Sequence, residues 1–198
     1  TLAENSPTIG MGALGVGCGP IDGGDIYEGP WYVSVDGSDD TGDGSPDNPF
    51  ASIQSGIDAS INGDSVLVGP GTYYEEIKYN SKDLAVISTD GPLSTIISTL
   101  GRNVEITYTS SLPAVLQGFT ITGDERDGEG VMVTSNPYAP ILEDLVIFNK
   151  QWGVTAHSHA ALYNVTLTNN DYGISQPGGS STISNSIIWH NDEFPLEL

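Results

Sequence analysis

The sequence has very few basic residues. Five Lys and Arg stand against 26 Asp and Glu, which gives the chain of 198 residues a formal net charge of −21. A surface of this sign repels the phosphates of nucleic acids and the headgroups of anionic lipids. The charge therefore excludes nucleic acid as an expected partner, whereas calcium and neutral glycans are compatible with it.

Cysteine and long apolar runs are also scarce. Cys18 is the single cysteine, so no internal disulfide can form. No apolar run approaches the roughly 20 residues that a membrane-spanning helix needs, so membrane insertion is not expected. The first residue is Thr1, and no signal peptide precedes the domain. We interpret this as a secreted chain whose signal peptide has been removed, with an extracellular or cell-surface location.

Turn-forming residues, in contrast, are abundant. The chain has 25 Gly and 12 Pro, and only 16% of its residues are charged. Disordered acidic tails are more highly charged, and helical bundles contain fewer glycines and prolines. The composition therefore favours an all-β protein with many turns.

Four segments share one pattern and indicate an internal repeat. They are LQGFTITG from Leu116, LEDLVIFN from Leu142, LYNVTLTN from Leu162 and ISNSIIWH from Ile183. Their spacings are 26, 20 and 21 residues, and their first, fourth and sixth positions are mostly apolar. The alternation from the fourth to the sixth position is typical of a β-strand.

Two further series run through the sequence. A glycine precedes an apolar residue at Gly130-Val131, Gly153-Val154 and Gly173-Ile174. Earlier in the chain, three apolar residues recur every 20 residues, namely Val66, Val86 and Ile106. Each period thus holds at least two short strands, which is too little to bury an apolar face alone.

Strands that recur at the same place in each period pair with their equivalents in neighbouring periods. The expected fold is therefore an all-β, right-handed parallel β-helix, a solenoid in which each coil contacts only its neighbours. The alternative is a β-sandwich, which needs Asn-Gly or Asp-Gly hairpin turns between matched strands. The dipeptides of this kind that begin at Asp36, Asn62, Asp90 and Asp127 do not lie midway between matched strands.

One helix is predicted, over about residues 49–61, as a cap on the first coil. Asn48 is the expected N-cap and Pro49 the first helical residue, with Gly63 as the stop. The apolar stripe of this helix consists of Phe50, Ile53, Ile57 and Ile61.

The two ends of the predicted solenoid differ. No amphipathic helix follows the last coil, so its strand edge is expected to be open. Residues 1–30 form a Gly-rich, extended segment outside the solenoid of residues 31–198. This segment either folds back along its own solenoid or docks on the open coil of a neighbouring copy, which repeated head to tail gives a filament. The predicted interface residues are Leu2, Ile9, Met11, Leu14, Val16 and Ile21 on the segment, and Ile188, Trp189, Phe194 and Leu196 on the last coil.

Two stretches carry a family resemblance. WYVSVDGSDDTGDGSPDNPFASIQSGIDAS from Trp31, followed by GDSVLVGPGTYYEEI, resembles the start of secreted right-handed β-helix proteins of the pectate-lyase-like superfamily. NSIIWHND and SPTIGMGALGVGCGP are similar to a late coil and to the closing segment of large bacterial surface proteins built from such units. The resemblance implies the fold from Trp31 onward, but that superfamily includes lyases, hydrolases, adhesins and structural repeats. In those relatives the closing segment follows the last coil, whereas here it precedes the first.

The loop DGSDDTGDGSPDN is the strongest candidate for a metal site. Oxygen-bearing side chains alternate along it, and this alternation is similar to the first part of a calcium-binding loop. The candidate calcium ligands are Asp39, Thr41, Asp43, Ser45 and Asp47. Phe50 stands where such a loop has its bidentate glutamate. The alternative is a turn whose carboxylates favour the start of the following helix.

No recognisable catalytic constellation is present, so an enzyme is not predicted. The basic residues are Lys78, Lys82, Arg102, Arg126 and Lys150, and none lies in a catalytic pattern. His157 and His159 leave a zinc site incomplete. The first functional hypothesis is a structural subunit that assembles with itself into an extracellular filament. The second is a surface module that binds or degrades carbohydrate.

Overall fold

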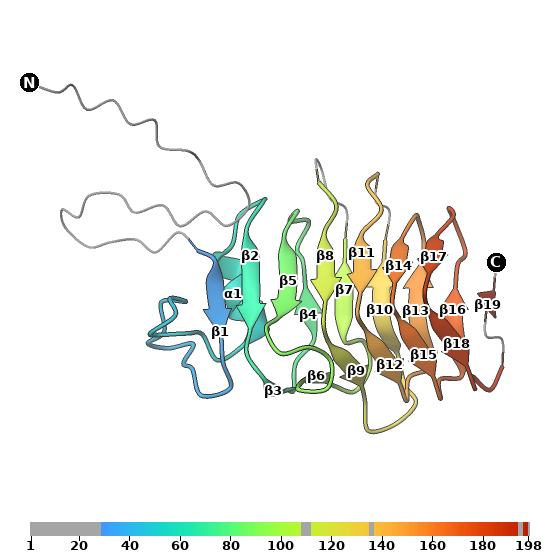
Figure 1. Ribbon diagram of the computed structural model, residues 1–198, viewed down its shortest axis with the longest axis horizontal. Coiled ribbons are helices and arrows are strands. Elements are labelled where there is room, and N and C mark those ends of the chain that lie inside the picture. Colours follow the sequence, from blue (N-terminus) through green and yellow to red (C-terminus); the bar gives the residue numbers. More distant parts are fainter. Residues whose placement is uncertain (1–28, 108–111, 135–136, 194–195, 198) are drawn as a thin grey trace, which may run out of the picture.

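The computed structural model describes residues 29–107, 112–134, 137–193 and 196–197. Within these residues the chain forms a parallel β-solenoid with one short helix, as the repeat predicted (Figure 1). Three parallel sheets run along the stack, and successive strands of each sheet come from successive coils.

Sheet 1 has seven strands, in the order of the chain. They are β1 (Trp31–Val33), β2 (Ser65–Val68), β5 (Ala85–Ser88), β8 (Val115–Gln117), β11 (Ile141–Glu143), β14 (Ala161–Tyr163) and β17 (Thr182–Ser184).

Sheets 2 and 3 have six strands each. Sheet 2 contains β3 (Gly71–Tyr73), β6 (Thr95–Ser98), β9 (Thr120–Thr122), β12 (Val146–Phe148), β15 (Thr166–Thr168) and β18 (Ile187–Trp189). Sheet 3 contains β4 (Ile77–Lys78), β7 (Val104–Ile106), β10 (Glu129–Val133), β13 (Trp152–Ala156), β16 (Tyr172–Ser175) and β19 (Leu196–Glu197). We call β17, β18 and β19 the last coil.

The register confirms the repeat. The first position of the four segments is the inward residue of sheet 1, where Leu116 pairs with Leu142, Leu142 with Leu162 and Leu162 with Ile183. The sixth position is the inward residue of sheet 2. The glycine series lies in sheet 3, where Val131 pairs with Val154 and Val154 with Ile174.

The prediction that Val66, Val86 and Ile106 belong to one series is wrong. Val66 does pair with Val86, but the next partner of Val86 is Leu116, 30 residues further on. Ile106 belongs to sheet 3, where it pairs with Val133. The spacing of 20 does not hold here because the turns of this coil are longer.

The corners between sheets explain the many asparagines. At the corner from sheet 1 to sheet 2, Asp144, Asn164 and Asn185 have φ of 53°, 55° and 51°. At the corner from sheet 2 to sheet 3, Asn149 and Asn169 have φ of 59° and 55°. Asn and Asp tolerate this left-handed conformation better than other residues with a side chain, so they mark where the chain turns.

The helix α1 (Ile53–Ala59) covers the first end of the stack, but it is shorter than predicted. Its N-cap is Ser52, whose side chain accepts a hydrogen bond from Ser55 N, and not Asn48. Pro49 and Phe50 lie outside the helix because the Phe50 backbone extends along β1, with Phe50 N donating to Tyr32 O at 3.0 Å.

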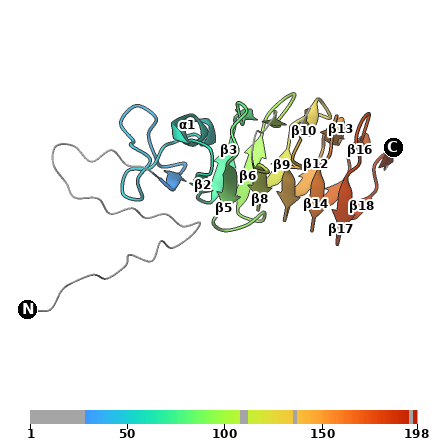
Figure 2. The ribbon, with the colours of Figure 1, turned by 90° about the horizontal axis from the view of Figure 1, so that it is seen from above.

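The helix packs closely on the sheets behind it. Ile53 and Ile57 are completely buried, as the apolar stripe predicted, whereas Ile61 follows the helix and is exposed. A Cβ atom at Gly56 would lie 2.7 Å from Val66 Cγ1, so only glycine allows this approach. Figure 2 shows α1 at one end of the stack and the last coil at the other.

Candidate docking edge

Two inward side chains of the last coil, those of Ile183 and Ile188, are more exposed than their partners on the preceding coil. Ile183 is 38% exposed, although its partner Leu162 on the preceding coil is 1% exposed. Ile188 is half-buried, whereas its partner Leu167 is completely buried. These residues continue the core but have no described coil above them.

Two outward side chains enlarge this apolar end. Ile187 is 59% exposed and Trp189 is 71% exposed, and both lie on β18. We call the end formed by Ile183, Ile187, Ile188 and Trp189 the docking edge.

The backbone of the docking edge is also open in the part of the chain that the structure describes. β17 and β18 are the final strands of their sheets and pair on one side only, with β14 and β15. Unpaired strand edges are templates for pairing with another strand.

A ladder of asparagine side chains leads to this edge. Asn170 Oδ1 accepts a hydrogen bond from Lys150 N at 3.1 Å, and Asn191 Oδ1 accepts one from Asn170 N at 3.1 Å. The amide groups bond back to the coil below, with Asn170 Nδ2 donating to Ile147 O and Asn191 Nδ2 to Leu167 O. Among the described residues, the N–H of Asn191 has no acceptor of this kind.

One arginine holds the last coil to earlier ones. Arg126, in the turn between β9 and β10, donates from Nη1 to Asp171 Oδ1 at 3.1 Å and also to Asp192 Oδ2. Its Nη2 donates to Asn169 Oδ1 at 2.7 Å. The hydrogen bonds to Asp192 and Asp171 raise the pKa of Arg126. We call this group the arginine clamp; it ties three coils together beside the docking edge.

The predicted interface residues divide between described and undescribed parts. Ile188 and Trp189 lie at the docking edge, and their role as interface residues stays a prediction. Leu196 lies in β19, which pairs with β16 through Leu196 and Ile174. The other members lie outside the described residues, namely Leu2, Ile9, Met11, Leu14, Val16, Ile21 and Phe194.

The proposed calcium ligands make hydrogen bonds within their own loop. Asp39 Oδ1 accepts from Ala51 N at 2.9 Å and from Ser52 N at 3.0 Å, directly before α1. Desolvation by itself would raise the pKa of Asp39. These hydrogen bonds and those from the Ser52 and Ser55 side chains outweigh it, so the pKa of Asp39 is lowered.

The other candidate ligands in this loop are turn residues. Asp43 Oδ1 accepts from Ser45 N at 2.9 Å, and Thr41 Oγ1 donates to Ser38 Oγ at 3.0 Å. Within the described ranges, no three His, Cys, Asp or Glu side chains gather as a metal site. Calcium binding stays a prediction, while the geometry matches a turn that leads into the helix.

Sequence reasoning missed a second carboxylate at this helix. Glu75 accepts from Ile53 N at 2.8 Å and from Gln54 N at 3.0 Å. Burial raises the pKa of Glu75 despite these hydrogen bonds. No local signal reveals this contact, because Glu75 lies on the next coil, more than 20 residues away.

Of the basic residues, Lys150 is the most unusual because it is completely buried. Its Nζ donates to Gly101 O at 2.6 Å and to Thr99 O at 3.3 Å. Burial lowers the pKa of Lys150, although the charges of Asp127 and Glu129 oppose the shift. The contacts of the ammonium group are backbone carbonyls, so Lys150 closes a turn of the solenoid.

The remaining basic and histidine candidates lie apart from one another. Arg102 donates to Glu105 at 2.8 Å and to Glu129 at 3.3 Å on the outer side of sheet 3. His159 Nδ1 lies 2.9 Å from Ser180 O on the following coil. The structure therefore brings no histidine pair together with a carboxylate in the described residues.

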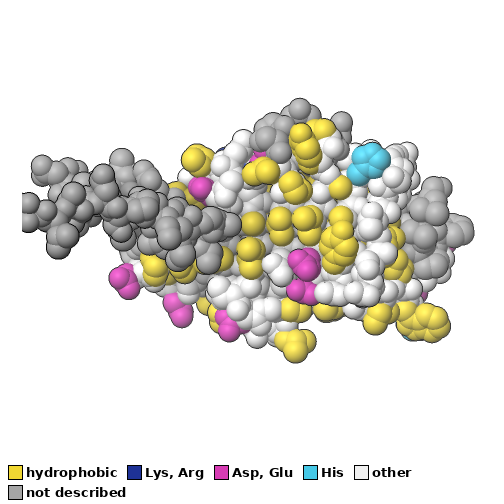
Figure 3. Space-filling model, turned by 45° about the horizontal axis from the view of Figure 1, so that its top comes forward, with side chains coloured by type: hydrophobic (Ala, Val, Ile, Leu, Met, Phe, Trp, Pro, Cys, Tyr) yellow, Lys and Arg dark blue, Asp and Glu magenta, His cyan; other side chains and the backbone are white. Residues whose placement is uncertain are grey.

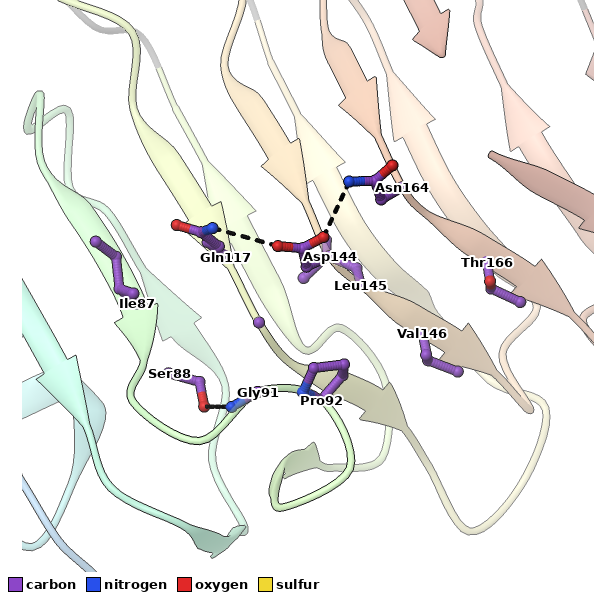
Figure 4. A pocket seen from close by; sticks show the side chains of 11 residues that line it. Ile87, Ser88, Gly91, Pro92, Gln117, Asp144, Leu145, Val146, Asn164 and Thr166 are labelled. Atoms are coloured by element: carbon purple, nitrogen blue, oxygen red, sulfur yellow. Dashed lines mark hydrogen bonds between the residues drawn. The ribbon is translucent and has the colours of Figure 1, made fainter. Parts of the chain in front are cut away.

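A shallow groove of about 330 Å³ lies at the corner between sheets 1 and 2. Gln117 Nε2 donates to Asp144 Oδ2 at 3.3 Å, and Asn164 Nδ2 donates to Asp144 Oδ1 at 3.1 Å, so three coils contribute to one polar row (Figure 4). Ile87 and Val146 supply apolar parts of the lining.

The lateral faces differ from the docking edge. Figure 3 shows hydrophobic side chains in rows on the face that it presents, with acidic side chains beside them. The outward residues Ala85, Val115 and Ile141 are neighbours in sheet 1, where their strands pair on both sides. This face therefore lacks the unpaired backbone groups of the last coil.

No family model matches the sequence, and no curated protein or solved structure matches it. In the described part of the chain, the seven-residue α1 is the only helix, and no helix is long and apolar enough to cross a membrane.

Proposed function

We propose that this chain is a structural subunit of an extracellular filament or surface assembly, and that copies join head to tail at the docking edge. The observation that supports this proposal is the exposure of Ile183, because its equivalents on the five strands from β2 to β14 are at most 1% exposed. A core residue with this exposure loses its stabilising burial unless another strand covers it.

The partner at this edge is an extended chain. β17 and β18 offer parallel strand edges, and a further strand added there forms the same hydrogen bonds as the coils below. Residues 1–30 of a neighbouring copy are the proposed occupant, since they combine Leu2, Ile9, Met11 and other apolar residues with many glycines. The extracellular location belongs to the proposal and rests on the resemblance from Trp31 onward.

The charge of the chain sets a condition for assembly. Each copy has a net charge of −21, so copies repel each other at low ionic strength. Salt shortens the range of this repulsion to about 8 Å at physiological ionic strength. Assembly is therefore expected to strengthen with added salt, the opposite of an association driven by charge pairs.

The test is Ile183→Asp in the full chain. Association buries residue 183, so a carboxylate there should weaken association at least about tenfold in sedimentation velocity, with fewer filaments in electron micrographs. Leu93→Asp is the matched control, because Leu93 is 93% exposed and lies away from the edge. A wild-type chain that stays monomeric at high concentration and in salt would refute the proposal, as would equal effects of the two variants on association.

The corner groove favours a second candidate, the binding of neutral glycans. Its amides, carboxylate and hydroxyl groups can bond sugar hydroxyls, and its apolar lining can contact the ring. A glycan array with wild type and Asp144→Ala tests this candidate. Binding that disappears in Asp144→Ala would support the groove, and no binding to any glycan would exclude it.

A further inference from the structure

The path from sheet 2 to sheet 3 has a fixed pattern of side chains. In the coil of β15 and β16, Leu167 points into the core, Asn169 makes the turn, Asn170 continues the asparagine ladder and Ile174 returns to the core. In the coil of β12 and β13 the same places are held by Ile147, Asn149, Lys150 and Val154.

The first nine residues of the chain, TLAENSPTI, match the core and ladder positions of this pattern, but have Glu4 at the turn position of Asn169 and Thr8 at the position of Gly173. Placed on TLTNNDYGI, residues 166–174, they are identical at Thr1, Leu2, Asn5 and Ile9. These include both core positions, Leu2 and Ile9, and the ladder position, Asn5. Pro7 falls on Tyr172, the first residue of the sheet 3 strand, whose N–H donates to Gln151 O of the coil below at 2.8 Å, so this register forgoes that one hydrogen bond.

The docking edge lacks the residues that this pattern supplies. Ile188 needs an apolar neighbour on the next coil, and Leu196 occupies the sheet 3 position equivalent to Ile174. The N–H of Asn191 is at the place where Asn170 N meets a side-chain carbonyl of the following coil. A strand with an apolar residue, then an asparagine three places later, then an apolar residue four places after that fits this edge.

We infer that residues 1–9 form the next half-coil over β18 and β19 of a second copy, in a single register that leaves β17 and Ile183 to the rest of residues 1–30. Leu2 packs on Ile188, the Asn5 side chain accepts from Asn191 N and donates to Ile188 O, and Ile9 lies beside Leu196. Ala3 takes the outward position next to Trp189. This inference rests on the proposed function and specifies the partner segment and its register.

The length of the chain permits this arrangement. Residues 10–28 separate the half-coil from the described part of the donor copy, and extended they span up to about 60 Å. One coil adds only about 4.8 Å to the stack. The donor solenoid, with α1 over its first coil, can therefore stand clear of the edge that its own first residues complete.

In this register Leu2 faces the core and Ala3 faces outward, because the side chains of a strand alternate between its two faces. Leu2→Asp places a carboxylate in the core and should weaken association at least about tenfold. Ala3→Asp changes the charge equally but faces outward, so its effect should stay within about twofold to threefold. The readout is the association constant from sedimentation of the full chain, with circular dichroism to check folding.

Cross-linking tests the same register directly. One copy carries Ala3→Cys and another Trp189→Cys, both with Cys18→Ser, and a short thiol-reactive linker is added to the mixture. The inference expects a cross-linked dimer from this pair, and none when Glu4→Cys replaces Ala3→Cys. The dimer forms only between copies, so its appearance also shows docking in trans.

The outcomes separate the two proposals. A chain that never associates contradicts both. A chain that associates and loses association in Ile183→Asp, but responds equally to Leu2→Asp and Ala3→Asp, keeps the docking edge and overturns the register. Cross-linking from Glu4→Cys instead of Ala3→Cys likewise overturns the register, since it reports a shift of one residue.

Discussion

The two ends of the solenoid are built from the same coil but finished differently. At the first end, α1 lies over the inward residues of the sheets, and its own apolar residues Ile53 and Ile57 are completely buried. At the last end, Ile183, which is an inward residue of sheet 1, is 38% exposed. The comparison shows that burial in a solenoid depends on the next coil or cap, and that the sequence of a coil alone does not secure it.

The largest expected effect comes from truncating one isoleucine at each end. Ile57→Ala removes a side chain buried between α1 and the sheets, which should lower the free energy of unfolding by about 2–5 kcal/mol. Ile183→Ala removes a side chain with one covered face, so the loss in the monomer should be about 1 kcal/mol. Urea denaturation at low protein concentration measures both, and equal losses would contradict the difference between the ends.

The arginine clamp gives an intermediate effect at the last end. Arg126→Ala breaks hydrogen bonds to Asp171, Asp192 and Asn169, which belong to the two coils nearest the edge. Because these groups are partly exposed, the global free energy of unfolding should fall by only about 1 kcal/mol. Amide hydrogen exchange should nevertheless rise in β18 and stay unchanged in β2. Lys78→Ala, an exposed basic residue near the first end, is the control.

The sequence predicted the stack because its core positions repeat. Leu142, Leu162 and Ile183 stand at nearly constant spacing, so their pairing could be read directly. Ile106 was assigned to the wrong series because spacing fails where turns vary in length. Ile188 and Trp189 lie on β18, the final described strand of its sheet, and their part in an interface stays a prediction.

Other parts of the structure leave no local pattern. The arginine clamp joins Arg126 to Asp192, 66 residues away. The stretch GDERDGEG, residues 123–130, contains Arg126 but has no pattern that predicts this contact. The helix start was misplaced because Asn48 and Ser52 are both good N-caps, and the choice depends on β1. The Phe50 backbone pairs with that strand, so the helix can begin only after it.

The smallest expected effect concerns acid stability at the capped end, where two carboxylates shift in opposite directions. Hydrogen bonds from Ser52 and Ala51 outweigh desolvation and lower the pKa of Asp39 from 3.8. Asp39 therefore contributes stability that is present above pH 3.8 and is lost as the pH falls through its lower folded value. Burial raises the pKa of Glu75 above 4.5 in the folded protein. The charged form of Glu75 therefore costs stability, and this cost disappears as the pH falls through the folded-state pKa toward 4.5.

Because the two pKa shifts have opposite directions, the stability that Asp39 contributes is lost at a lower pH than the pH at which Glu75 takes up its proton. Asp39→Asn should therefore lower the unfolding midpoint slightly at neutral pH, and its difference from wild type should shrink as the pH falls below 3.8. Thermal unfolding from pH 7 to pH 2 measures the difference, with Asp40→Asn, an exposed neighbour, as the control. A difference that grows toward low pH would mean that Asp39 holds α1 in its protonated form, and the assigned direction of its pKa shift would then be wrong.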